Sequence, residues 1–265
     1  MKRLRAHIKT AIFTIALTAF CQSAFADDNS ERTFIIKGSS TVHNYIFHTN
    51  VDGLHQDCSS DFKVMSTNSS KGLADLANGV ADIAMISTDL LPLVENLNAS
   101  EGLNIDINDY STHKVAVAKV LLITHPKNPI KSLSKEQAKG LFTGTIKNWE
   151  DIGVENIGVV NIVTEPPTGG VYNTILQQVT DNQPITEKRL TMQTAPQTSI
   201  IVSQVTGSFS MLSDATPKEH RLEIKVVDTP DFNISQNLYF IAKKGTAGDK
   251  LALEIIKTFH KRNKL

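Results

Sequence analysis

The sequence predicts an α/β protein built on parallel or mixed sheets, and two observations lead to this class. Short apolar and β-branched runs alternate with amphipathic runs of roughly ten residues along most of the chain. Several of the apolar runs end in a turn rich in glycine and hydroxyl side chains, as at a strand-to-helix junction. A cleavable export sequence precedes the alternating part. The alternation therefore belongs to a folded portion that follows the export sequence.

The first 26 residues have the three parts of a secretory signal peptide. Four basic residues come first, an apolar run over 11–20 follows, and Ala24-Phe25-Ala26 matches the A-x-A cleavage pattern. The apolar run is too short to span a bilayer. We therefore expect cleavage after Ala26. Cys21 raises lipid anchoring as an alternative, although cleavage after Ala26 would remove it.

Composition restricts the partners and the stabilising chemistry. The 27 Lys and Arg residues balance 27 Asp and Glu, but four of the basic ones lie in the signal peptide, so the mature chain carries a net charge of −4. Without a basic field, nucleic acid is not expected as a partner. Cys58 is the single cysteine left after cleavage, which rules out an internal disulfide. We read Cys58 as a structural thiol, because no activating base is evident beside it.

Eight segments read as strands, each an apolar or β-branched run closed by turn residues. The run that Pro126 closes is the longest of them. The predicted strands cover 33–37, 62–66, 82–87, 115–124, 158–163, 208–212, 222–227 and 238–243.

Six segments have helical periodicity. The third of them starts with Ser134-Lys135-Glu136-Gln137, the pattern of a capping box. The predicted helices cover 41–49, 70–78, 134–142, 170–179, 198–205 and 251–261.

Two segments, 127–133 and 214–221, are the best candidates for linkers. They divide the chain into a signal peptide at 1–26, a first lobe at 27–126, a second lobe at 127–213 and a return to the first lobe at 214–265. A hinge is expected between the lobes.

Three of the glycine- and hydroxyl-rich turns predict binding of a small anion. They are Gly38-Ser39-Ser40-Thr41-Val42, the segment 66–72, and Pro167-Thr168-Gly169-Gly170. Each stands where a helix begins, and a helix N-terminus offers unpaired N–H groups and the positive end of a dipole. Serine and threonine are also ordinary helix caps, so capping alone is the competing explanation for each turn.

The same turns resemble those of phosphate-specific substrate-binding proteins of ABC transporters. Asn68-Ser69-Ser70-Lys71-Gly72 and the run 76–85 are similar to the second loop, helix and strand of that family. The segment 141–149, which ends at Trp149, resembles the family pattern IFTGKIKNW, and 164–170 resembles REPGSGT. Trp149 is expected to pack in the second lobe rather than contact a ligand.

This resemblance implies a two-lobed periplasmic-binding-protein fold whose lobes close on one anion. It also implies a periplasmic location, delivery of phosphate or a similar oxyanion to an inner-membrane ABC permease, and a monomeric protein. The residues expected at the ligand are Ser39, Ser40, Thr41, Val42, Ser69, Ser70, Ser87, Thr168, Gly169 and Gly170.

Two positions depart from the family pattern. Thr164 stands where well-known members have an arginine, and Ser87 stands where they have an aspartate that accepts the phosphate proton. An arginine–phosphate pair is bidentate and charge-assisted. Lys71, His43 and Asp89 are the candidates to restore part of the missing charge.

These departures keep a second function open on the same fold: an accessory, sensor, matrix or adhesion protein with weak or altered ligand binding. An enzyme is not expected, because the sequence has no G-x-S-x-G elbow and no metal-ligand cluster. No cofactor and no metal are expected either.

Overall fold

The computed structural model describes residues 32–265. The predicted signal peptide at 1–26, with Cys21, lies outside the described residues. Residues 33–265 form one compact unit, to which the following description applies. Within the described part of the chain, no helix combines the length and the apolar character needed to cross a membrane.

The described strands form a mixed sheet in the order β2-β1-β3-β9-β4-β7-β5-β6, with β8 also beside β4. The pairs of β1 with β2 and β3, and of β5 with β6 and β7, are parallel, whereas β9 and β4 run antiparallel to their neighbours. The strands are β1 (Phe34–Ser39), β2 (Phe62–Thr67), β3 (Ile83–Ile86), β4 (Tyr110–Thr124), β5 (Asn161–Thr164), β6 (Arg189–Thr191), β7 (Ser208–Ser213), β8 (Lys225–Val227) and β9 (Ser235–Lys243).

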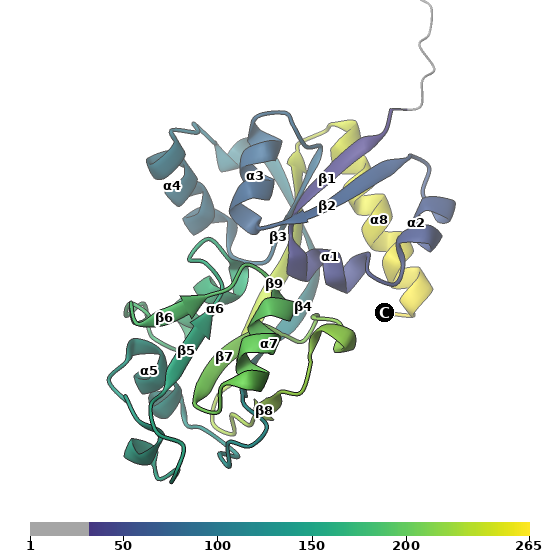
Figure 1. The fold of residues 1–265 in the computed structure, drawn as a ribbon. Helices are drawn as coiled ribbons and strands as arrows, with labels where there is room; N and C mark the ends of the chain where they lie inside the picture. The colour runs from purple at the N-terminus through teal and green to yellow at the C-terminus, as the bar shows by residue number, and fades with distance from the viewer. Residues whose placement is uncertain (1–31) are drawn as a thin grey trace, which may run out of the picture. The chain divides into compact units, whose positions relative to one another are not determined.

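Helices cover the strands on both faces (Figure 1). The α-helices are α1 (Ser40–Ile46), α2 (Val51–Asp57), α3 (Ser69–Ala77), α4 (Leu90–Glu101), α5 (Lys135–Thr143), α6 (Gly170–Gln178), α7 (Ala195–Gln204) and α8 (Ala247–Asn263). Three short 3-10 helices complete the described elements: η1 (Ile107–Asp109), η2 (Trp149–Ile152) and η3 (Lys218–His220).

All eight predicted strands and all six predicted helices are present, with shifted ends. The sequence reading missed β6, α2 and α4. The first predicted helix, 41–49, was too long: α1 stops at Ile46, and α2 begins at Val51 after a turn. The expected α/β class with mixed sheets and two lobes is confirmed.

Two groups of apolar side chains define the two lobes. In the first lobe, β1 and β3 are buried between α1, α2 and α8 on one face and α3 and α4 on the other. In the second lobe, β5 and β7 are buried between α5 and α6 on one face and α7 on the other. Burial on both faces explains why β3 reads as an unbroken apolar run.

The long strands β4 and β9 connect the lobes (Figure 1). Residues 110–119 of β4 pair with β9, and residues 120–124 pair with β7. Val120 and Ile234 already belong to the core of the second lobe. The predicted lobe boundaries at 126 and 213 stay a prediction, but this packing favours boundaries at 119/120 and 234/235.

Two glycines bring the first helix N-termini close to the sheet. A Cβ on Gly38, whose φ is +135°, would lie 2.2 Å from the carbonyl oxygen of Met85 on the neighbouring strand. A Cβ on Gly72 in α3 would lie 2.5 Å from the Cα of Gly38. A side chain on Gly38 would push β3 away from β1, and a side chain on Gly72 would push α3 away from the end of β1. These contacts place the beginnings of α1 and α3 at the same edge of the sheet.

Candidate functional site

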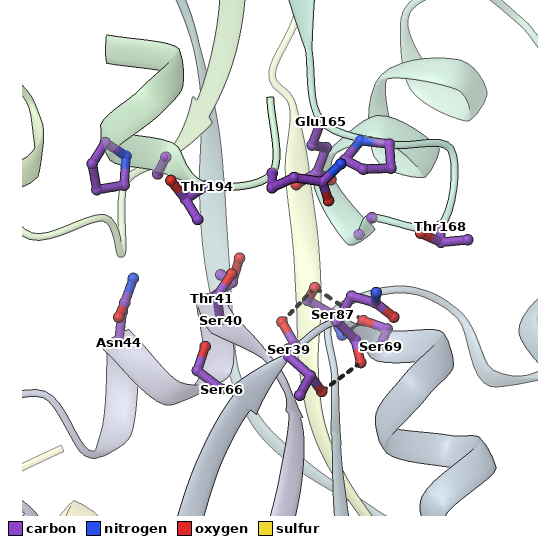
Figure 2. A pocket seen from close by; sticks show the side chains of 18 of the residues that line it. Ser39, Ser40, Thr41, Asn44, Ser66, Ser69, Ser87, Glu165, Thr168 and Thr194 are labelled. Atoms are coloured by element: carbon purple, nitrogen blue, oxygen red, sulfur yellow. Dashed lines mark hydrogen bonds between the residues drawn. The ribbon is translucent and has the colours of Figure 1, made fainter. Parts of the chain in front are cut away.

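A cleft of about 480 Å³ lies at the carboxyl ends of the parallel strands, between side chains of the two lobes. Figure 2 shows first-lobe residues such as Ser39 and Ser69 on one side and Glu165 and Thr194 of the second lobe on the other. The lining residues are Ser39, Ser40, Thr41, Asn44, Ser66, Thr67, Asn68, Ser69, Ser87, Glu165, Pro166, Thr168, Gly169, Gly170, Gln193, Thr194, Ala195, Pro196 and His220.

Three buried serines from three strand ends form one hydroxyl cluster (Figure 2). The hydroxyl of Ser39 donates to Ser87 Oγ over 2.9 Å. The backbone N–H of Ser87 donates to Ser69 Oγ over 3.1 Å, and the oxygens Ser69 Oγ and Ser87 Oγ are 3.5 Å apart. Each hydroxyl can both donate and accept, so the cluster can turn donors toward an anion.

Capping and cleft lining coincide in these turns. Ser39 caps α1 by accepting from the N–H of Val42, and Asn68 caps α3 by accepting from the N–H of Lys71. Ser39 and Asn68 therefore do cap helices, which was the alternative to anion binding for these turns. Both capping residues also line the cleft.

The second lobe supplies the N-terminus of α6 through Gly169 and Gly170. Gly170 lies against the first lobe: a Cβ there would be 2.0 Å from Ser87 Oγ. A Cβ on Gly169 would instead be 2.2 Å from Glu165 Oε1. The absence of a side chain at Gly170 lets the backbone of the second lobe approach the serine cluster directly, and its absence at Gly169 leaves room for the Glu165 carboxyl group.

The start of α7 also lines the cleft, which the sequence reading missed. Thr194 caps this helix by accepting from the N–H of Gln197, and Pro196 stands in its first turn. Thr194, Ala195 and Pro196 all line the cleft. The available signal was Thr194 with a proline two residues later, because threonine is a common helix cap and proline is well tolerated in the first turn of a helix.

Glu165 is the single carboxylate in the lining and was also not predicted. Its Oε1 accepts the N–H of Tyr172 in the first turn of α6 over 2.7 Å. Burial raises the pKa of Glu165 to about 7, and the hydrogen bonds from the N–H groups of Tyr172 and Val171 offset only part of that rise.

No lysine or arginine is among the cleft-lining residues within the described chain. Thr164, which the resemblance places at the position of the family arginine, is fully buried in β5, and its hydroxyl has no hydrogen-bond partner among the described residues. Lys71 turns to Asp75, with Nζ 2.7 Å from Oδ1. His43 and Asp89 do not line the cleft either. None of the candidates for restoring the missing charge therefore does so.

Eight of the ten predicted ligand residues line this cleft. They are Ser39, Ser40, Thr41, Ser69, Ser87, Thr168, Gly169 and Gly170. Val42 and Ser70 do not, because both are buried on the inner sides of their helices. The structure thus brings the three predicted turns to one place. Contact of any of these residues with a ligand stays a prediction.

Trp149 is a packing residue. Trp149 is fully buried in the second lobe and donates its indole N–H to the carbonyl of Gly207 over 2.9 Å, which confirms its predicted packing role.

Burial raises the pKa of the Cys58 thiol, as do the nearby carboxylates of Glu254 and Asp57, while a hydrogen bond to Thr258 lowers it. Cys58 therefore lacks the electropositive surroundings of a reactive thiol. Among the described residues no group of three or more His, Cys, Asp or Glu could hold a metal ion.

The family profile of the PBP superfamily domain matches residues 23–260, so the chain belongs to that superfamily. The protein is similar to the phosphate-binding protein PstS of Bacillus subtilis, with 25% identity over 159 residues, which cover 60% of this chain and 50% of that protein. The matched segment thus spans about half the length of this curated relative. The resemblance to phosphate-binding members of the superfamily is confirmed.

Solved structures agree on the fold. A phosphate ABC transport receptor from Vibrio cholerae aligns with a TM-score of 0.64 and 19% identity, covering 87% of this chain and 96% of the other. A putative phosphate ABC transporter substrate-binding protein from Clostridium perfringens, solved with bound phosphate, aligns with a TM-score of 0.69 and 18% identity, covering 86% and 92%. At these identities the likeness establishes the fold alone.

Proposed function

We propose that this protein is a periplasmic substrate-binding protein that captures phosphate or a similar oxyanion and delivers it to an inner-membrane ABC permease. One observation carries the proposal: the hydroxyl cluster of Ser39, Ser69 and Ser87 faces the bare N-terminus of α6 at Gly169 and Gly170. Helix N-termini and hydroxyl donors hold oxyanions well.

The ligand would act by holding the lobes together. Ser69 and Ser87 belong to the first lobe, and Thr168 and Gly170 belong to the second. An anion that contacts both sets favours the closed state by its differential affinity for that state. The hinge would lie where β4 and β9 pass between the cores, near 119/120 and 234/235.

The likeness to phosphate-binding proteins supports the ligand class, a role as a receptor rather than an enzyme, and function outside the cytoplasm. Export by the signal peptide, cleavage after Ala26, monomeric state and the permease as partner are parts of the same proposal. So are ligand contacts at the eight expected residues that line the cleft.

Calorimetry on the exported protein, stripped of ligand, tests this proposal. Phosphate is titrated first, and arsenate, sulfate and molybdate follow as competitors. We expect micromolar phosphate binding, which corresponds to about 8 kcal/mol. Failure of all four anions to bind would overturn it.

A cleft lining without lysine or arginine favours a second candidate: an accessory, sensor or matrix protein with weak anion binding. Such a protein would bind phosphate no more tightly than about 1 mM, or about 4 kcal/mol. The same titration distinguishes the two roles, because the affinities differ by about a thousandfold.

A further inference from the structure

The charge of the cleft does not match a doubly charged ligand. Across the described residues that line the cleft, the ionisable side chains are the carboxyl of Glu165 and the imidazole of His220. A dianion placed there would meet helix N-termini and hydroxyls but no lysine or arginine, and it would face a carboxylate whenever Glu165 is ionised.

The carboxyl group of Glu165 is hydrogen-bonded to the N-terminus of α6, which would also hold the anion. Its Oε1 accepts the N–H of Tyr172, and the Cα of Gly169 lies against its carboxyl group. Two negative groups would thus compete for one helix N-terminus, unless a proton is held between them or on Glu165.

We propose that Glu165 couples anion binding to a proton, so that the cleft takes up a tetrahedral oxyanion together with one proton and prefers singly charged or proton-carrying anions over dianions that carry no proton. This inference rests on the proposed function of anion capture. It names the charge state of the ligand and the residue that determines it.

The proton can come from the anion or from solvent. An anion that carries its own proton, such as monobasic or dibasic phosphate, donates that O–H to the Glu165 carboxylate, and no proton is taken from solvent. An anion without a proton requires Glu165 to bind one from solvent, which makes the carboxyl neutral and a donor. The raised pKa of Glu165 supports this, since a carboxyl that is half-protonated near neutral pH needs little energy to take up a proton.

Other titratable groups around Glu165 are few. On α6 the nearest is Tyr172, over whose ring the guanidinium of Arg189 lies at 5.7 Å. On η3, His220 lines the cleft whereas Lys218 and Glu219 do not, and on α1 neither His43 nor Tyr45 lines it. The segments β5, β7 and α7 contain none. Glu165 and His220 are therefore the groups whose titration an experiment must separate.

The test uses perrhenate, a tetrahedral monoanion, and sulfate, a tetrahedral dianion, neither of which titrates near neutral pH. Calorimetry at pH 6 and pH 8 should find perrhenate binding about tenfold tighter at pH 6, because a single carboxyl with a pKa of about 7 is mostly protonated at pH 6 and mostly ionised at pH 8. Sulfate should bind more weakly than perrhenate at both pH values. Repeating the titration at pH 8 in buffers of different ionisation enthalpy should give about one proton taken up per perrhenate bound.

The matched variants are E165Q, H220N and E150Q. The E165Q side chain keeps the acceptor for Tyr172 but cannot ionise, so its perrhenate affinity should be the same at both pH values, without proton uptake. H220N should keep the pH dependence. E150Q is the control, because Glu150 likewise accepts backbone N–H groups, from Ile157 and Gly158, yet lies outside the cleft lining.

The possible outcomes separate the role of Glu165 from the proposed function of anion capture. Perrhenate binding that is equal at pH 6 and pH 8, or a pH dependence that survives in E165Q or disappears in H220N, would overturn the role of Glu165. Phosphate binding without perrhenate binding at pH 6 would also overturn it while leaving the proposed function intact. Failure of perrhenate together with phosphate, arsenate, sulfate and molybdate would overturn both.

Discussion

Gly170 of the second lobe lies so close to Ser87 of the first that a Cβ on the glycine would be 2.0 Å from Ser87 Oγ and 2.9 Å from the Ser87 carbonyl oxygen. Ser87 is itself fixed by Ser39 and Ser69. The approach of Gly170 to Ser87 across the cleft therefore depends on a missing side chain, and Ser87 is the serine that the resemblance places at the position of the family aspartate.

Gly170→Ala should hold the lobes apart. The added methyl group cannot coexist with the Ser87 side chain at its present distance, so we expect phosphate affinity to fall by at least about tenfold, or 1.4 kcal/mol. Calorimetry measures the affinity, and small-angle scattering should give a larger radius of gyration in phosphate.

The control for this change is Gly53→Ala in α2. The three atoms nearest to a Cβ there all belong to the flexible Arg262 side chain, outside the cleft. The double variant Ser87→Ala/Gly170→Ala removes the nearest clashing atom and should recover part of the closure. An unchanged phosphate affinity in Gly170→Ala would refute the contact.

Asp75→Asn should destabilise the first lobe by about 3–5 kcal/mol, because it leaves the half-buried ammonium of Lys37 without its partner. Burial raises the pKa of Asp75, but hydrogen bonds from Lys37 and Lys71 outweigh that effect and hold the pKa below its usual value. The stabilisation from Asp75 is therefore present above the pKa of the unfolded chain and is lost as pH falls through the lower folded pKa. Urea unfolding at several pH values measures both effects.

Lys71→Met serves as the comparison for Asp75. Lys71 bonds to the same carboxylate but is exposed, so its loss should cost little. Equal destabilisation by Asp75→Asn and Lys71→Met would show that burial of the Lys37–Asp75 ion pair does not cause the expected loss of stability.

Local sequence was sufficient for the turns that form the cleft. Ser39, Ser69 and Gly169 could be predicted because a strand, a small or hydroxyl residue and a helix start are adjacent in the chain. The parallel arrangement then places successive turns at one edge. What the sequence alone could not provide was the direction of each side chain, and so Val42 and Ser70, which face the interior, were included as well.

The parts that were missed depend on contacts between distant segments. The first half of β4 is polar around His113 and Lys114, and it is a strand because it pairs with β9, more than a hundred residues away. Glu165 stood within a matched motif, but its place beside the N-terminus of α6 follows from the fold of the loop between them. Thr194 joins the cleft through the packing of α7 against β5 and β7.

Trp149→Phe should destabilise the second lobe by about 2–4 kcal/mol. Phenylalanine cannot donate to the carbonyl of Gly207, and it leaves a space beside Phe209, whose ring centroid is 6.1 Å from that of Trp149. Urea unfolding followed by circular dichroism gives the free energy. Leu190→Ala, on an exposed strand position, should have little effect. A variant as stable as the wild type would mean that the Trp149 hydrogen bond contributes nothing.

Glu165→Gln should remove one component of the pH dependence of stability. The folded protein raises the pKa of Glu165 from 4.5 to about 7, because burial disfavours the ionised form. Its contribution to stability is therefore full below the unfolded pKa and is lost as pH rises through about 7. As pH rises through this range, the unfolding free energy of the wild type should fall relative to that of the variant, by an amount on the order of 3 kcal/mol at most. Urea unfolding of both proteins across this range gives that difference, in which groups common to both cancel. A difference that stays constant with pH would show that the carboxyl is ionised in the folded cleft as readily as in water.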